Sequence, residues 1–372
     1  MQATFLQVER LFRQQQARGA FPGGQLVVRR DGQVLCDVAL GWARAPAGAE
    51  PGIAVGPETR FQFMSASKPF TAFAIALLED SGELEVERPV ARYFPEFGQG
   101  GKADVTVLDI LTHRSGLVFE NLANHPEYWP DWERVVQELA AAKPKYRRGT
   151  LAYSPAGFGW ILGELVRRIT GCTIQDFLVP RLPAALGGVR FLDPSQRDTV
   201  ARSYWLGPTR LMLAGHDLAA DFEQVNNDYT AIEACVPGAG MLANARELSA
   251  FYELLLSGGG STIRSETLAK YITLQTRGFE RELGVPVRLG RGFGLGSLGP
   301  HPFGWWNTRP CYGHAGGFGV LGFADPRSRI AVGIVTNGHR GVGDLLRRFA
   351  PLGMQIRAAA RALPQTPHLL AA

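Results

Sequence analysis

Residues 61–73 read FQFMSASKPFTAF and place two serines, Ser65 and Ser67, immediately before a lysine and a strongly apolar run. The run predicts a helix that opens at Ser65 and continues to about Glu79. Positions three apart share one face of a helix, so Ser65 and Lys68 project together while Ser67 points elsewhere. The spacing therefore selects Ser65 as the partner of the lysine.

A serine hydroxyl is a weak nucleophile until a base removes its proton, and Lys68 can act as that base if burial lowers the pKa of its ammonium group. The start of a helix also favours a developing anion through its dipole and its free N–H groups. Pro69 suits the first turn, which tolerates a missing N–H. The alternative is that the serines only cap the helix, a common role of serine at this position.

A second stretch, from Leu151 to Gly171, predicts a helix that Ser154 caps, Pro155 opens and Gly171 ends. Tyr153 stands just before the cap, on the loop that enters the helix. Beside a lysine ammonium, its phenol would be pushed toward phenolate and could act as a base. The alternative is a half-buried aromatic side chain, the common case for a lone tyrosine.

A third stretch, residues 312–322, reads YGHAGGFGVLG and is rich in glycine. Glycines along a strand mark a place where another group approaches the backbone closely. They suit a substrate laid along a strand edge and a second N–H donor to an oxyanion. Residues 317–322 also match GxGxxG, but a dinucleotide site needs a helix directly afterwards, and here another strand follows. We therefore reject a dinucleotide-binding motif.

Strand patterns lie at both chain ends, and helical patterns lie between them. Residues 25–40 predict a hairpin around an Asp-Gly turn. Three later strands are expected, at Arg291–Ser297, Tyr312–Ala324 and Arg329–Thr336. A last helix is expected at Gly343–Leu363, bent at Pro351. We expect one antiparallel sheet domain built from residues 1–80 and 231–372, a mainly helical domain of residues 81–230, and a site in the cleft between them.

Composition excludes several classes of protein. The 372 residues carry a formal net charge of +5 and a pI of about 9.1, but the basic residues are scattered, and the one dense basic run, residues 143–148, is typical of solvated surface. The four cysteines form no CxxC pair, which argues against a metal knuckle. The first helix is amphipathic, and no run approaches the roughly 18 apolar residues of a membrane span. We expect a cytoplasmic protein that binds neither nucleic acid nor membrane, and its oligomeric state stays open.

The chain resembles class C serine β-lactamases, DD-peptidases and their esterase relatives, the family VIII carboxylesterases. The resemblance lies in three motifs that occur in the same order as in that family: Ser65-x-x-Lys68, Tyr153-Ser-Pro and His314-Ala-Gly. The connecting stretches 93–97, 105–117 and 238–251 are similar to that family as well. The resemblance implies an α+β fold of the β-lactamase/transpeptidase type, with an antiparallel sheet flanked by helices and an inserted all-helical domain. It implies no metal and no organic cofactor.

The resemblance also implies roles for individual residues. Ser65 would be the nucleophile, and Lys68 and Tyr153 would share the proton transfers. The backbone N–H groups of Ser65 and Gly317 would form the oxyanion hole. His113 and Arg114, which lie in the stretch 105–117, are assigned a structural role beneath the nucleophile helix.

Two departures from the family pattern bear on the substrate. Pro155 stands where β-lactamases commonly carry an Asn that holds the substrate amide, and His314 stands where they commonly carry a Lys that helps to bind a carboxylate. Both losses favour a carboxylic ester over an acylamino carboxylate. His314 and Gly316 are candidate substrate contacts. His314 could instead serve only as a partner of the strand.

Aromatic residues in loops suggest walls for an acyl pocket. The candidates are Trp129 and Trp306, with Trp132, Trp305 and the pair Tyr204-Trp205 as further aromatics. Such clusters equally often pack lobes together. Alternatives to an esterase are a D-aminopeptidase or DD-peptidase, a β-lactamase, an acyltransferase to a biosynthetic acceptor, and a binding protein on an inactive enzyme scaffold.

Overall fold

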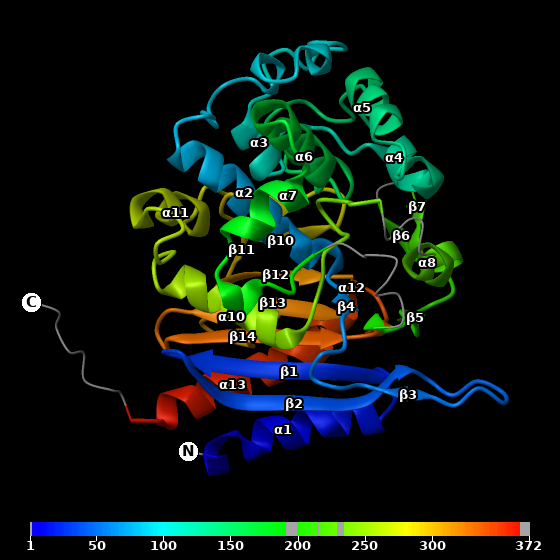
Figure 1. Ribbon diagram of the computed structural model, residues 1–372, viewed down its shortest axis with the longest axis vertical. Helices are drawn as coiled ribbons and strands as arrows, with labels where there is room; N and C mark the ends of the chain where they lie inside the picture. Colours follow the sequence, from blue (N-terminus) through cyan, green and yellow to red (C-terminus); the bar gives the residue numbers. More distant parts are fainter. Residues whose placement is uncertain (1, 191–198, 214–215, 229–233, 318, 365–372) are drawn as a thin grey trace, which may run out of the picture.

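An antiparallel sheet of nine strands, in the order β3-β2-β1-β14-β13-β12-β11-β10-β9, forms the centre of the fold (Figure 1). The structure, a computed structural model, describes residues 2–190, 199–213, 216–228, 234–317 and 319–364. The strands of the sheet are β1 Gly23–Arg30, β2 Gln33–Arg44, β3 Ile53–Ala54, β9 Thr276–Glu280, β10 Val285–Leu289, β11 Gly294–Leu295, β12 Tyr312–Gly316, β13 Val320–Asp325 and β14 Ile330–Thr336. Short strand pairs join β4 Phe61–Gln62 to β8 Leu242–Ala243, β5 Tyr204–Trp205 to β15 Gly338–His339, and β6 Met212–Leu213 to β7 His216–Asp217.

The two ends of the chain meet inside this sheet, because β1 pairs with β14 and sets Leu26 opposite Ile334. The predicted hairpin is confirmed: β1 and β2 pair around a turn at Asp31 and Gly32, both of which have positive φ. Alternate β1 side chains point to opposite faces, so Leu26 belongs to one hydrophobic cluster and Val27 to the other. Both faces of the sheet are therefore buried.

Helices cover both faces of the sheet. One cluster packs α1 (Gln2–Ala17) and α13 (Ala350–Ala362) against the sheet, and both helices lie in the lower part of Figure 1. On the other face, α10 (Ala245–Leu256) contacts β14, β1 and β13. The helix α2 (Lys68–Asp80) is buried between the sheet and the helical region above it.

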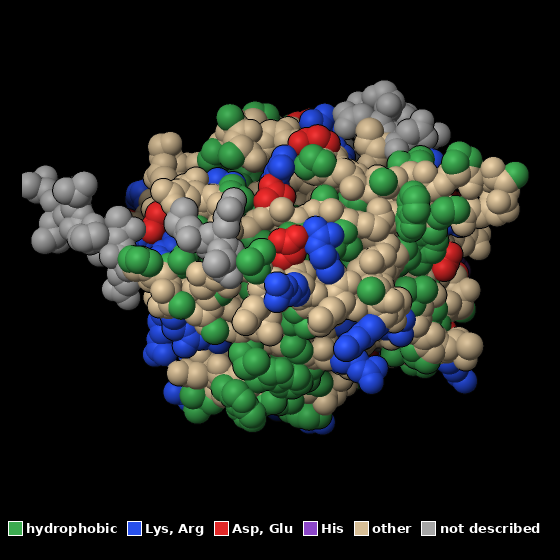
Figure 2. Space-filling view, turned by 90° about the horizontal axis from the view of Figure 1, so that it is seen from below, with side chains coloured by type: hydrophobic (Ala, Val, Ile, Leu, Met, Phe, Trp, Pro, Cys, Tyr) green, Lys and Arg blue, Asp and Glu red, His purple; other side chains and the backbone are tan. Residues whose placement is uncertain are grey.

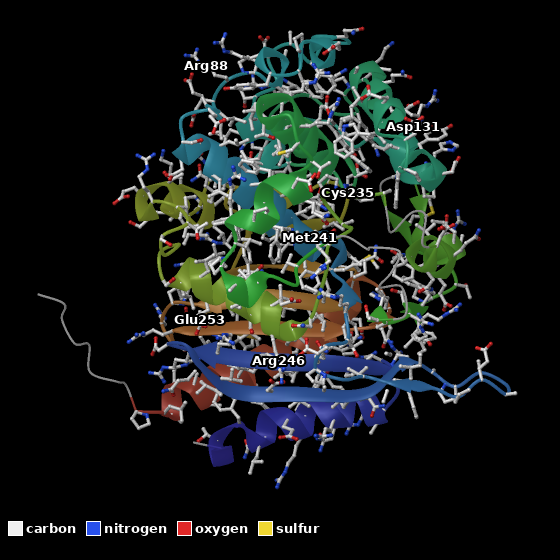
Figure 3. The ribbon with its side chains drawn as sticks, in the orientation of Figure 1. Arg88, Asp131, Cys235, Met241, Arg246 and Glu253 are labelled. Carbon is white, nitrogen blue, oxygen red and sulfur yellow. The ribbon has the colours of Figure 1, made fainter. Side chains whose placement is uncertain are left out.

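The helical region contains α3 Val107–Leu111, α4 Glu120–Asn124, α5 Trp132–Ala141, α6 Gly157–Thr170, α7 Ile174–Leu178 and α8 Leu218–Asn227, with α11 Ser265–Ile272 beside α2. The segment between Cys235 and Met241, both labelled in Figure 3, runs through the middle of the molecule toward the sheet. The bounds of the two expected domains, 1–80 with 231–372 and 81–230, stay predictions.

Several predicted elements differ in detail. The expected strand Tyr312–Ala324 is two strands, β12 and β13, with Gly317 and Gly319 in turn conformation between them. The strand expected at Arg291–Ser297 is shorter in the structure, where β11 contains two residues, Gly294–Leu295. The strands β9 and β10 were not predicted. The helix expected from Pro155 begins at Gly157 with Ala156 as its N-cap, although it ends at Gly171 as expected.

The C-terminal helix, expected at Gly343–Leu363, is present but contains an irregular turn. It consists of α12 (Val342–Asp344), a π-helical turn (Leu345–Phe349) and α13, in which Pro351 occupies the first turn. The backbone stays right-handed helical from Val342 to Ala362, and the π-helical turn lies directly before Pro351, where an irregular turn can accommodate the missing N–H of proline.

The surface bears on the expected partners. On the face shown in Figure 2, Lys and Arg side chains are scattered among hydrophobic and neutral ones and form no single basic patch. Among the described residues, no helix has both the length and the apolar character needed to cross a membrane.

Candidate active site

The nucleophile candidate lies on a 3₁₀ turn, Met64–Ser67, and not on the first turn of α2 as expected. Met64 has a φ of +47°, an uncommon conformation for a non-glycine residue. Neither serine uses its side chain to cap a helix: Ser67 is the N-cap of α2 without a capping hydrogen bond, and its Oγ accepts from the Met241 N–H at 3.2 Å. The interpretation of both serines as caps is therefore wrong.

The Lys68 side chain is fully buried and its Nζ has three neighbours. It lies 3.1 Å from Ser65 Oγ, 3.0 Å from the carbonyl oxygen of Pro155 and 3.2 Å from that of Gly238. Burial lowers the pKa of Lys68 to about 7. A neutral amine has two N–H donors and one lone pair, so the two carbonyls can take the donors while the lone pair faces Ser65 Oγ.

Tyr153 is the second side chain that contacts Ser65, because its hydroxyl donates a hydrogen bond to Ser65 Oγ at 2.8 Å. Its ring centroid lies 5.1 Å from Lys68 Nζ. Desolvation nevertheless raises the pKa of Tyr153 well above its usual value, with the nearby Glu280 carboxylate adding to the shift. The direction of this shift favours a neutral phenol over the expected phenolate.

His113 lies closer to the site than expected. Its ring centroid is 4.8 Å from that of Tyr153, and its Nδ1 accepts from the Ser154 N–H at 3.3 Å. Burial first, and then the charges of Lys68 and His314, lower the pKa of His113 well below its usual value. His113 is thus a neutral ring that supports Tyr153, whereas its neighbour Arg114 donates to Thr276 Oγ1 on β9 at 2.9 Å.

Glu280, at the end of β9, was missed by the sequence reasoning. Its carboxylate is 2% exposed and accepts from three backbone N–H groups, those of Tyr153 at 2.5 Å, Glu282 at 2.9 Å and Leu283 at 2.5 Å. It thereby ties the β9–β10 turn to the backbone that carries the phenol. Since β9 has no clear alternation of apolar residues, no sequence signal marked this carboxylate.

We expect Glu280→Gln to slow ester turnover by about tenfold and to lower stability by about 1–3 kcal/mol, because an amide cannot accept from all three donors. The matched control is Glu282→Gln on the same turn, since the Glu282 carboxylate contacts Tyr146 and Lys145 and not Tyr153. Steady-state kinetics and thermal melts of both variants check this. Equal losses of kcat in the two variants would contradict a specific role of Glu280.

The glycine-rich strand β12 packs directly against the nucleophile turn. A Cβ at Gly316 would collide with the carbonyl oxygen of Phe63 and lie 2.7 Å from the Ala66 nitrogen, and one at Gly317 would collide with the Met64 side chain. The group that approaches the strand is therefore the nucleophile turn itself. Gly317 has a φ of +48°, and no acceptor within the described part of the chain binds its N–H.

A cavity of about 390 Å³ opens beside Ser65 and Tyr153. Its lining comes from both the helical region and the sheet and is mainly apolar, including Trp129, Trp160, Phe222, Val225, Leu283 and Val287. The charged residues in the described lining are Asp221 and Glu280, and no Lys or Arg lines it. The described lining therefore offers an acyl group an apolar surface and no Lys or Arg to pair with a carboxylate.

Two of the other predicted substrate-binding residues, His314 and Trp129, line the cavity. His314 lines the cavity, and its Nδ1–H donates to the Ala315 carbonyl at 2.6 Å. Burial first, and then the charge of Lys68, lower the pKa of His314 to about 4, so the ring is neutral. Trp129 also lines the cavity, with its indole N–H held by the Leu122 carbonyl at 2.9 Å.

The remaining aromatic candidates lie elsewhere. Trp306 is 68% exposed, is absent from the described cavity lining, and offers its carbonyl to Arg357 on α13 at 3.3 Å, so its assignment to the site was wrong. Trp132 stacks edge-on against Trp160 and donates to Glu164, which is a packing role. The pair Tyr204-Trp205 forms β5 and is likewise absent from that lining. Within the described ranges, no group of three or more His, Cys, Asp or Glu side chains could hold a metal ion.

The sequence of this chain is similar to known proteins over most of its length. The family model for beta-lactamases matches residues 8–351. This chain belongs to the beta-lactamase family. The esterase/beta-lactamase LipL of Mycobacterium tuberculosis is 32% identical over 346 residues, which cover 85% of this chain and 77% of LipL.

Two solved structures are similar to this chain over nearly its whole length. A family VIII carboxylesterase is similar with a TM-score of 0.79 and 26% identity, covering 96% of this chain and 97% of its own. EstA from Arthrobacter nitroguajacolicus is similar with a TM-score of 0.78 and 27% identity, covering 97% and 98%. The predicted family and the predicted α+β β-lactamase-like fold are confirmed.

Proposed function

We propose that this protein is a serine hydrolase that cleaves carboxylic esters through an acyl-enzyme on Ser65. The observation that carries the proposal is that Ser65 Oγ contacts both Lys68 Nζ and the Tyr153 hydroxyl at the edge of an apolar cavity. Membership of the beta-lactamase family and the similarity to carboxylesterases support this class of reaction.

In the acylation step, neutral Lys68 takes the proton of Ser65 as Oγ attacks the ester carbonyl. The carbonyl oxygen becomes an oxyanion, which the N–H groups of Ser65 and Gly317 stabilise. When the C–O bond to the alcohol breaks, the neutral phenol of Tyr153 gives the leaving oxygen its proton. The Lys68 ammonium then returns a proton to Tyr153, so both groups regain their starting states.

Deacylation runs through the same groups in reverse. Water takes the place of the alcohol and loses a proton to the pair formed by Lys68 and Tyr153 as it attacks the acyl carbon. The acid is released, and Ser65 Oγ recovers its proton. A neutral phenol suits this cycle, because the cycle needs an acid at the leaving oxygen as well as a base at the nucleophile.

The substrate class follows from the lining of the cavity. An apolar acyl chain gains about 0.8 kcal/mol, roughly fourfold in affinity, for each methylene it buries. An acyl group with a carboxylate finds no Lys or Arg in the described lining, and Pro155 offers no side-chain amide. We infer that the substrate is a neutral small-molecule ester.

A panel of substrates on one protein sample tests the proposal. We expect kcat/KM for nitrophenyl esters to rise roughly fourfold for each methylene from acetate to hexanoate, on the order of 200-fold in all, because each added methylene is buried. A nitrophenyl hemisuccinate should be at least about tenfold poorer than the butyrate, because its carboxylate would be desolvated without a partner.

A chromogenic cephalosporin and a D-alanine nitroanilide complete the panel. Both should be turned over at least about a hundredfold more slowly than the best ester, since the site lacks the usual anchors of such substrates. Faster turnover of either one would replace the esterase proposal with β-lactamase or aminopeptidase activity. An added alcohol that diverts the acyl group would reveal acyl transfer.

A further inference from the structure

His339, on β15, lies behind the turn that carries Gly317. Its imidazole is buried, and its Nδ1 is hydrogen-bonded to the carbonyl oxygen of Gly317. A carbonyl oxygen can only accept, so Nδ1 carries the proton and donates. Burial lowers the pKa of His339 to about 4, which keeps the ring neutral. Nothing in the acylation or deacylation steps uses this side chain.

The ring of His339 also fills space that the turn leaves open. A Cβ at Gly319 would lie 2.8 Å from His339 Cε1, and one at Gly317 would lie 3.4 Å from His339 Nδ1. On its other side, the His339 ring packs against Phe222, with 4.8 Å between the ring centroids. The turn is therefore enclosed between Met64 of the nucleophile turn and the imidazole.

Further bonds fix the neighbouring peptide groups. The Gly319 N–H donates to the Gly316 carbonyl at 3.0 Å, which orients the peptide group whose other end is the Gly317 N–H. The Gly319 carbonyl accepts from both the N–H and the Oγ1 of Thr336, at 2.9 and 2.8 Å. Arg348 in turn donates to Thr336 Oγ1 at 2.8 Å. Each end of the turn is thus anchored, and His339 is the donor at Gly317 itself.

We propose that His339 is a positioning residue that holds the Gly317 peptide so that its N–H stays aimed at the oxyanion formed on Ser65. The inference rests on the proposed acyl-enzyme mechanism. Without the imidazole, the Gly317 carbonyl loses its donor and the turn loses one of its walls. The Gly317 N–H then spends less time aligned with the oxyanion, which forms only in the transition state.

Three variants test this role. His339→Leu removes the donor and should lower kcat by about 10- to 100-fold with KM within about twofold, since loss of one oxyanion donor costs about 10²–10³ in kcat. In His339→Asn, the amide Nδ2 can take the place of Nδ1, and most of the lost kcat should return. In His339→Gln, the amide extends past that position and should not restore it.

Kinetics with a nitrophenyl ester, labelling of Ser65 by a fluorophosphonate and thermal melts should be measured on all four proteins. Wild-type kcat in the Leu variant, or equal kcat in the Asn and Gln variants, overturns the inference. If the Leu variant does not fold, at least about tenfold higher kcat for Asn than for Gln, at similar KM, supports it. Wild-type protein that neither turns over esters nor is labelled at Ser65 refutes the proposed function instead, which keeps the two failures distinct.

Discussion

Ser65→Ala is expected to lower kcat for nitrophenyl esters by at least about 10⁴-fold while the protein stays folded. The hydroxyl is the atom that bonds to the acyl carbon, so its removal ends covalent catalysis and leaves only binding and the oxyanion donors. The fold should survive, because the hydrogen bonds of Ser65 Oγ within the described part of the chain go to the two catalytic side chains and cap no helix. Retained turnover at more than about 1% would remove Ser65 from the mechanism.

Ser67→Ala is the matched control, two residues away on the same 3₁₀ turn. Its hydroxyl accepts from the buried Met241 N–H, so its loss should cost about 1–3 kcal/mol of stability with little effect on kcat. The pair of variants should therefore show opposite patterns, one losing activity and the other stability. A fluorophosphonate followed by mass spectrometry should add its mass to the peptide containing Ser65 in the Ser67 variant and not in the Ser65 variant.

The local motifs were accessible from the sequence because each is a short-range pattern. Three-residue spacing selected Ser65 beside Lys68, and the Asp-Gly turn fixed the hairpin of β1 and β2. The order of the three motifs along the chain identified the family and hence the fold. The order of the motifs also predicted Tyr153 as a catalytic residue, although no local pattern predicted the hydrogen bond between its hydroxyl and Ser65 Oγ.

What the sequence did not reveal depends on contacts between distant segments. The nucleophile turn packs onto Gly316 and Gly317, more than 240 residues away along the chain, and no local pattern predicts that contact. Glu280 and His339 act through backbone groups of other elements, and such bonds leave no sequence pattern. The pKa of Tyr153 depends on burial, which sequence spacing does not reveal. The prediction that Trp306 lines the acyl pocket was wrong because an aromatic residue in a loop can equally well face solvent.

Lys68→Met is expected to lower kcat/KM for esters by at least about 10³-fold, because it removes the base that takes the proton of Ser65. Methionine is unbranched and apolar, so it can fill the buried space of the lysine stem. The matched control is Lys102→Met. Lys102 is also fully buried with its Nζ on backbone carbonyls, those of Ala140 and Ala142, and it makes no contact with Ser65. Lys102→Met should lose stability and keep its kcat.

The pH profile ties this loss to the lysine. With a pKa of about 7, Lys68 becomes a free base as pH rises, so wild-type kcat/KM should increase up to about pH 7 and then level off. His314, with its pKa lowered to about 4, is already neutral in this range, and the raised pKa of Tyr153 keeps the phenol protonated. The residual activity of Lys68→Met should lack the rise near pH 7, whereas Lys102→Met should retain it.

The lowered pKa of Lys68 can also be detected in the free energy of unfolding, without measuring turnover. The unfolded chain keeps the lysine protonated up to about its ordinary pKa of 10.5, whereas the folded protein releases that proton near pH 7. Because the unfolded state then binds more protons, the free energy of unfolding contributed by Lys68 should rise with pH between these values. Denaturant melts of wild type and Lys68→Met at pH 7 and pH 9 measure this difference. An unchanged difference between the two pH values would mean that Lys68 remains an ammonium in the folded protein and cannot be the base.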